Sequence, residues 1–194
     1  MSSATKIPAR LTVAEFLDWC PEDGRVWQLV DGEPMAMARA STAHARMQTE
    51  IGALLRNHLL ERGSTCDVLT APGVAPRVGK ANNVRIPDLA ASCSPAGDNG
   101  RLLSEPVVVI EILSPSNHQE TSANVWAYTT IPSVREILVV SSVDVRAELL
   151  CRGADGSWPE QPATIEGGEV ALESIGFRCP LAAFYRTTRL AALR

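Results

Sequence analysis

Lysine is scarce in this sequence. Lys6 and Lys80 are the only lysines among its 18 basic residues, and all the others are arginines. The formal net charge of −4 gives no general attraction to nucleic acid, although it is compatible with a local basic groove. A site that needs a lysine ammonium group therefore has very few positions from which to obtain one.

Long apolar runs and closely spaced cysteine pairs are also missing. No stretch of about 18 apolar residues occurs, and the first residues lack the apolar core of a signal peptide, so we expect no membrane span and a cytoplasmic location. The five cysteines contain no Cys-x-x-Cys pair, which disfavours a zinc site or a disulfide framework and favours reduced thiols. They are Cys20, Cys66, Cys93, Cys151 and Cys179.

The remaining composition is that of one globular domain. The 194 residues are 45% apolar, which is enough to bury a substantial core. Segments with strand and helix patterns alternate, without an internal repeat or a clear linker. We therefore predict an N-terminal tail over residues 1–11 and a single α/β domain over residues 12–194.

The helix signals are strongest over residues 41–62. Ser41 is a suitable N-cap, Gly63 lies just beyond the end, and an apolar stripe between them should pack on a sheet. A capping box predicts a short helix over residues 12–19. We predict two further helices, over residues 116–130 and from Pro180 onward.

The strand signals indicate a hairpin followed by a sheet. Asp31-Gly32 joins two alternating segments, which predicts a hairpin over residues 25–37. Residues 107–113 are apolar on both sides, so we expect this strand at the centre of the sheet. The other predicted strands cover residues 66–70, 84–93, 136–140, 145–152 and 169–177.

Two carboxylates occur at the ends of apolar strands. Asp88 follows Ile86-Pro87, and Glu111 lies within the predicted central strand. Carboxylates are hard oxygen ligands, and a few of them can hold Mg²⁺ against a phosphate. Desolvating a glutamate is costly unless it is paired or binds a metal, so the alternative is a salt bridge from Glu111 to a core arginine.

These carboxylates are part of a wider resemblance. Pro87-Asp88, a spacer of 22 residues and then Glu111 resemble the PD-(D/E)XK nuclease superfamily. Further segments occur in an order similar to the Uma-type family of restriction endonucleases, a bacterial branch of this superfamily, over about residues 12–185. The matching segments are 27–33, Ser41 with His44, 86–88, 111–116, Tyr128 and 132–140.

The resemblance implies a fold and a function. The fold would be restriction-endonuclease-like, a mixed β-sheet flanked by helices, with Asp88 and Glu111 binding Mg²⁺ or Mn²⁺. The function would be hydrolysis of nucleic-acid phosphodiester bonds, with DNA a better candidate than RNA, by a homodimer. A metal-activated water would attack phosphorus in line, and the Ile112 carbonyl could complete the metal site.

The sequence departs from the family at the motif lysine. Leu113 stands where the superfamily has this lysine, and Asn124 stands where the family carries one on the following helix. A neutral asparagine can orient a water, but it cannot stabilise the negative charge that develops on a phosphate. Lys80 is our candidate for a relocated cation, whereas Arg85 should point to the opposite face from Asp88.

Three accessory residues complete the candidate site. Gln28 replaces the family's usual first-strand glutamate, and Glu33 is retained. His44 could contact a phosphate or hold Glu33, although a partly buried helix histidine explains it as well. Trp126 and Tyr128 could stack a base, but core packing explains them more simply.

Two functions therefore remain open. The carboxylate pair favours a metal-dependent endonuclease. The missing lysine and Gln28 favour a catalytically degenerate relative that binds a nucleic acid or a partner protein. We favour the endonuclease.

Overall fold

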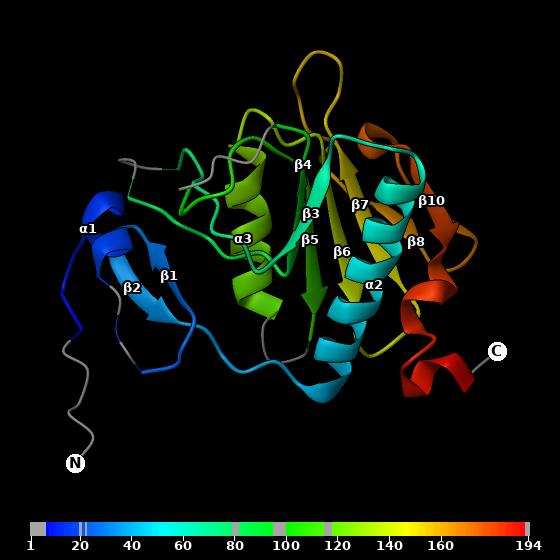
Figure 1. The fold of residues 1–194 in the computed structure, drawn as a ribbon, viewed down its shortest axis with the longest axis horizontal. Coiled ribbons are helices and arrows are strands. Elements are labelled where there is room, and N and C mark those ends of the chain that lie inside the picture. Colours follow the sequence, from blue (N-terminus) through cyan, green and yellow to red (C-terminus); the bar gives the residue numbers. More distant parts are fainter. Residues whose placement is uncertain are drawn as a thin grey trace.

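A mixed six-stranded β-sheet organises the protein (Figure 1). The computed structural model describes residues 7–19, 21, 23–78, 82–94, 100–114 and 118–192. The strand order is β3-β4-β5-β6-β7-β8, in which β5 and β6 are parallel and the other neighbours are antiparallel. The strands are β3 (Asp67–Thr70), β4 (Leu89–Ser92), β5 (Pro106–Leu113), β6 (Glu136–Ser141), β7 (Ala147–Cys151) and β8 (Ala163–Ile165).

β5 lies inside the sheet, between β4 and β6, as its two apolar sides predict. Side chains alternate along a strand, so neighbouring residues of β5 face different layers. Ile110 and Ile112 belong to the apolar cluster that includes α2, whereas Val109 packs with Tyr128 of α3. Glu111, two positions from Val109, therefore faces the α3 layer.

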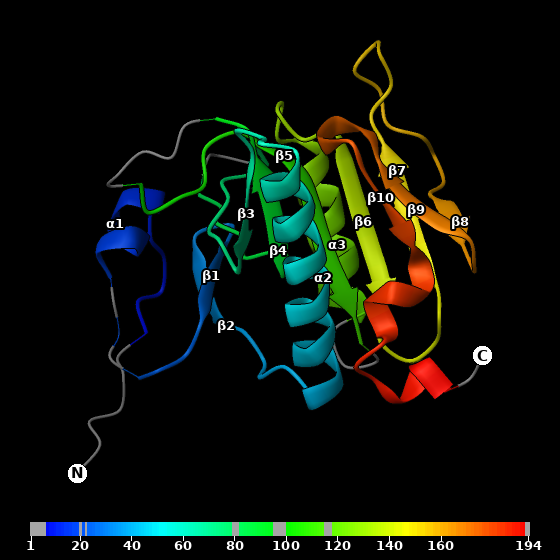
Figure 2. The ribbon, with the colours of Figure 1, turned by 45° about the vertical axis from the view of Figure 1, so that its right-hand side comes forward.

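Two long helices cover opposite faces of the sheet, as Figures 1 and 2 show. α2 (Thr42–Glu61) begins after its N-cap Ser41 and buries the predicted apolar stripe, including Met47, Ile51 and Leu55, against the sheet. α3 (His118–Thr129) covers the other face. No helix in the described part of the chain is long and apolar enough to cross a membrane.

The N-terminal segment lies beside the sheet, on the side of α3 (Figure 1). It consists of α1 (Val13–Asp18) and the hairpin of β1 (Trp27–Val30) and β2 (Glu33–Ala36). The predicted Asp31-Gly32 turn has positive φ at both residues, 50° and 89°, which suits a two-residue hairpin turn. Two backbone hydrogen bonds between Leu29 and Val84 join the hairpin to the rest of the domain.

The predicted strand over residues 84–93 is too long. Val84 and Arg85 form only isolated bridges, to Leu29 and Val74, and β4 begins after Asp88. Pro87 lies between the two parts and has no backbone N–H to donate, so it interrupts the ladder.

The C-terminal part differs from the prediction in two ways. The segment expected to be one strand over residues 169–177 forms β9 (Glu169–Leu172) and the start of β10 (Phe177–Pro180), with η1 (Glu173–Ile175) between them. The expected helix from Pro180 consists of two 3-10 segments, η2 (Leu181–Tyr185) and η3 (Arg189–Ala192). Leu181 and Phe184 are nevertheless buried, because a short 3-10 turn also places residues three apart on one side.

The expectation of reduced cysteines is wrong for one pair. Cys66 and Cys93 form a disulfide. The reason is strand register: β3 and β4 are antiparallel with Asp67 opposite Ser92, so the next two residues outward meet. Cys151 and Cys179 are free, and Cys20 lies outside the described residues.

Candidate functional site

Strand register brings Asp88 and Glu111 together. β4 and β5 are antiparallel with Leu89 opposite Ile110, so the residue before β4 comes opposite Glu111. Asp88 Oδ2 accepts a hydrogen bond of 2.7 Å from the backbone N–H of Ile112. The two carboxylates that lie 23 positions apart in the sequence thus form a close pair, and the charge of Asp88 raises the pKa of Glu111.

Helix α2 fixes the Asp88 side of the pair. His44, in the first turn, places Nε2 2.7 Å from Asp88 Oδ1. Gln48, one turn further, donates from Nε2 to the backbone oxygen of Asp88 at 2.8 Å. Because His44 binds Asp88, it does not serve the expected alternative of holding Glu33, which is exposed on β2.

Helix α3 fixes the Glu111 side. The Tyr128 hydroxyl donates to Glu111 Oε1 at 2.7 Å, and Asn124 also hydrogen-bonds the carboxylate. The Glu111 side chain is buried, and this burial, together with the charge of Asp88, raises its pKa well above the ordinary value. The hydrogen bonds from Tyr128 and Asn124 oppose the rise.

A third acidic residue reaches the site from α3. Glu120 accepts a hydrogen bond of 2.7 Å at Oε1 from Gln28 Nε2, so Gln28 of β1 positions a glutamate from another element. Glu120 is not among the site residues predicted from the sequence. Its spacing was a usable signal, since Glu120, Asn124 and Tyr128 are four residues apart and share one face of a helix.

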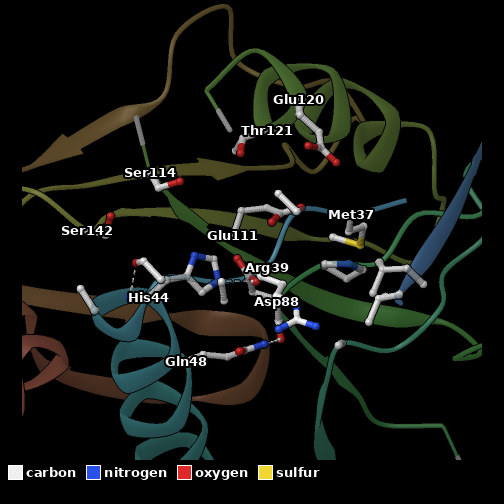
Figure 3. A pocket seen from close by; sticks show the side chains of 18 of the residues that line it. Met37, Arg39, His44, Gln48, Asp88, Glu111, Ser114, Glu120, Thr121 and Ser142 are labelled. Atoms are coloured by element: carbon white, nitrogen blue, oxygen red, sulfur yellow. Dashed lines mark hydrogen bonds and ion pairs between the residues drawn. The ribbon is translucent and has the colours of Figure 1, made fainter. Parts of the chain in front are cut away.

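These side chains open into one pocket of about 620 Å³. Figure 3 shows His44 and Gln48 from α2, Asp88 and Glu111 from the sheet, and Glu120 from α3 around it. The described residues that line the pocket include no phenylalanine, tyrosine or tryptophan. Tyr128 is fully buried, and Trp126, although 62% exposed, does not line the pocket, so neither stacks a base there.

The proposal that Lys80 replaces the missing lysine stays a prediction. Lys80 lies outside the described residues. Arg85 does not line the pocket, as expected from its position relative to Asp88. It is 6% exposed and donates to the Leu29 oxygen at 3.4 Å; burial lowers its pKa, and Tyr128 and nearby carboxylates oppose this. Leu113 is also absent from the pocket lining, so it does not plug the site.

The carboxylate oxygens of Asp88 and Glu111 are of the kind that a hard divalent cation binds when water or phosphate oxygens supply its remaining ligands. Among the described residues, no three histidine, cysteine, aspartate or glutamate side chains form a group that could hold a metal ion. The pKa of Glu111 is raised beside Asp88, however, so a positive charge here would stabilise the ionised carboxylates. Mg²⁺ is commonly held by one or two carboxylates, with waters and phosphate oxygens completing the shell.

The six-stranded mixed sheet with a helix on each face defines a class of mixed α/β fold. The fold superposes with a TM-score of 0.71 on the crystal structure of "a putative nuclease belonging to DUF820" from Anabaena variabilis, over 90% of this chain and 97% of that chain, at 15% sequence identity. A likeness at this identity establishes the fold alone.

The family follows from the sequence itself. The model of the Uma2 family, described as "Putative restriction endonuclease", matches residues 13–182, so the chain belongs to the Uma2 family. The protein is also 26% identical to "Uncharacterized protein slr1290" of Synechocystis sp. over 151 residues, which are 77% of this chain and 78% of the relative. The fold and family expected from the sequence are thus confirmed.

Proposed function

We propose that the protein is an endonuclease that uses Mg²⁺ or Mn²⁺, held by Asp88 and Glu111, to hydrolyse phosphodiester bonds of DNA. The observation that carries the proposal is the close pair of the buried Glu111 and the partly exposed Asp88, which opens into a pocket of about 620 Å³ in a chain of the Uma2 family. An ionised, buried Glu111 beside a second carboxylate is costly unless a cation joins them, which favours a metal-binding role over a purely structural one.

Each carboxylate has a defined role in this proposal. A carboxylate oxygen has two lone pairs, so Asp88 can accept from Ile112 and His44 and still face a cation. Tyr128 and Asn124 hold Glu111 in one orientation. A divalent cation bound here would lower the pKa of a water and polarise the phosphate. His44 keeps Asp88 turned toward Glu111 while the phosphate approaches from the pocket.

Metal binding and cleavage test the proposal together. We expect calorimetry to detect Mg²⁺ and Mn²⁺ binding to the wild type and not to Asp88→Ala, and plasmid nicking to follow the same pattern. Asp67→Ala is a matched control, because Asp67 is exposed on β3 and, among the described residues, forms an ion pair with Arg56 alone. Nicking that persists in Asp88→Ala, or a wild type that binds no divalent cation, would contradict the proposal.

One observation favours a second function. Asn124 is buried and hydrogen-bonded to Glu111 at the position where the family has its lysine, which leaves this part of the pocket without positive charge. A protein that kept the metal but lost the chemistry would bind DNA through the pocket without cutting it. Calorimetric Mg²⁺ binding with DNA binding and no nicking, even with Mn²⁺, would select this alternative.

A further inference from the structure

Three arginines and no lysine are among the described residues that line the pocket. They are Arg25, Arg39 and Arg189. Arg25 is already engaged, since its Nε lies 3.9 Å from Asp23 Oδ2. Arg39 and Arg189 are exposed and form no ion pair with any described residue, so either guanidinium is available to an anion.

Chain position distinguishes Arg39 from Arg189. Arg39 lies in the segment between β2 and α2, two residues before the N-cap Ser41. The helix that starts there carries His44 and Gln48, which both hydrogen-bond Asp88. Figure 3 shows Arg39 among the pocket side chains together with His44, Gln48 and Asp88. Arg189 comes from η3 near the other end of the chain, where no described neighbour in sequence contacts the acidic pair.

Phosphodiester hydrolysis at Asp88 and Glu111 calls for a positively charged side chain in addition to the metal ion. A phosphodiester brings a further negative charge to a pocket that already contains Asp88, Glu111 and Glu120. A divalent cation offsets part of this charge, and the charge that builds up on the phosphate oxygens needs a further donor. Asn124 is neutral and Leu113 does not line the pocket, so neither provides it.

We propose that Arg39 binds the non-bridging oxygens of the phosphodiester at the carboxylate pair and takes over the electrostatic role of the missing motif lysine. This inference rests on the endonuclease function proposed above. A guanidinium offers parallel N–H donors that match two phosphate oxygens and remains protonated at any working pH. Arg39 therefore supplies charge and orientation, and no proton.

The pocket lining also indicates what is recognised. The described lining contains no phenylalanine, tyrosine or tryptophan on which a base could stack, and the ring of His44 is engaged with Asp88. An arginine fork beside two carboxylates instead suits the sugar-phosphate backbone, which carries no sequence information of its own. We expect this part of the protein to bind DNA through its phosphates.

Arg39→Ala, Arg39→Lys and the control Arg56→Ala test the inference. Arg56 is also an exposed arginine, but it pairs with Asp67 and does not line the pocket. In Arg39→Ala we expect single-turnover cleavage of a labelled DNA duplex to fall about 100-fold. We expect affinity for that duplex, measured by fluorescence anisotropy in Ca²⁺, to fall about 10-fold. The slope of log affinity against log salt concentration should decrease by about the contribution of one phosphate contact. Arg39→Lys should recover part of both losses, and Arg56→Ala should change neither.

Separate readouts distinguish this inference from the proposed function. Calorimetric Mg²⁺ affinity should be unchanged in Arg39→Ala, which shows that the carboxylate pair is intact. If the wild type cleaves DNA and Arg39→Ala cleaves it equally fast, the role of Arg39 is overturned, and the proposed endonuclease function is unaffected. If the wild type cleaves nothing, the endonuclease function fails, and Arg39 is then judged by anisotropy alone: equal duplex affinity of wild type and Arg39→Ala overturns its phosphate contact.

Discussion

Both faces of β5 carry buried apolar residues, but of the two only the α3 face carries a carboxylate. Toward α2, Ile110 and Ile112 join a continuous apolar cluster. Toward α3, the same strand presents Glu111, which hydrogen-bonds Tyr128 and Asn124. One strand thus contributes to the main core through one set of alternating residues and to the candidate site through the other.

The difference shows how this small domain can accommodate a destabilising site. Burying Glu111 beside Asp88 disfavours the folded state, as the raised pKa of Glu111 indicates. The apolar α2 face buries many large side chains that stabilise the same strand from behind. We expect mutations on the α2 face to change stability without changing the chemistry, and mutations on the α3 face to change the chemistry first.

Leu55→Ala should give the largest effect on stability. Leu55 of α2 is fully buried against the sheet, and removing a buried leucine side chain costs about 3 kcal/mol because it leaves a cavity. Chemical denaturation measures the loss. Mg²⁺ affinity, measured well below the unfolding transition, should be unchanged. Leu60→Ala on the same helix is the control, because Leu60 is 59% exposed and should cost less than about 0.5 kcal/mol. Equal losses in the two variants would remove the basis of the comparison.

Glu111→Gln should change how stability depends on pH. Burial and the charge of Asp88 raise the pKa of Glu111, so the folded protein holds this proton more tightly than the unfolded chain does. Without divalent cations, stability should therefore fall as pH rises from the ordinary value of 4.5 through the raised folded value.

A pH series of thermal unfolding measures this effect. Glu111→Gln should weaken the fall in stability, and Mg²⁺ should reduce it in the wild type, because a bound cation favours the ionised carboxylate. Glu61→Gln, at an exposed position of α2, should behave like the wild type. Parallel curves for the wild type and Glu111→Gln would show that this carboxylate does not set the pH dependence.

Tyr128→Phe should cost less stability than Leu55→Ala, about 1 kcal/mol for the lost hydrogen bond to Glu111. Without the hydroxyl, the pKa of Glu111 should rise further and Mg²⁺ affinity should fall. Tyr185→Phe is a matched control, because the hydrogen bonds of the Tyr185 hydroxyl to described residues all involve backbone atoms of Ser141 and Arg146. It should lose similar stability and keep the same Mg²⁺ affinity. A Tyr128→Phe protein with unchanged Mg²⁺ affinity would limit Tyr128 to a packing role.

Strong local patterns made most of the sheet and the long helix predictable. The apolar run of β5 and the stripe of α2 each have a single reasonable interpretation, and the turn residues Asp31-Gly32 specify their hairpin. The C-terminal 3-10 segments were misjudged because an apolar spacing of three or four residues over a single turn does not separate them from an α-helix.

The carboxylate pair could be anticipated, whereas its surroundings could not. Asp88 and Glu111 stand out because acidic residues are unusual at apolar strand ends. Arg39 lies in an irregular segment, where no periodicity predicts the direction of a side chain. The bridge between Cys66 and Cys93 depends on the register of β3 and β4, which short, partly exposed strands do not reveal in sequence.

That bridge also has a consequence for the unfolded chain. Cys66 and Cys93 are 27 positions apart and close a covalent ring that contains Asp88 and both strands of the β3–β4 pair. A loop of this length removes about 3.5 kcal/mol of conformational entropy from the denatured ensemble in the chain-entropy description. When oxidised, the chain therefore begins folding with the aspartate of the proposed metal pair already confined near the strands that will position it.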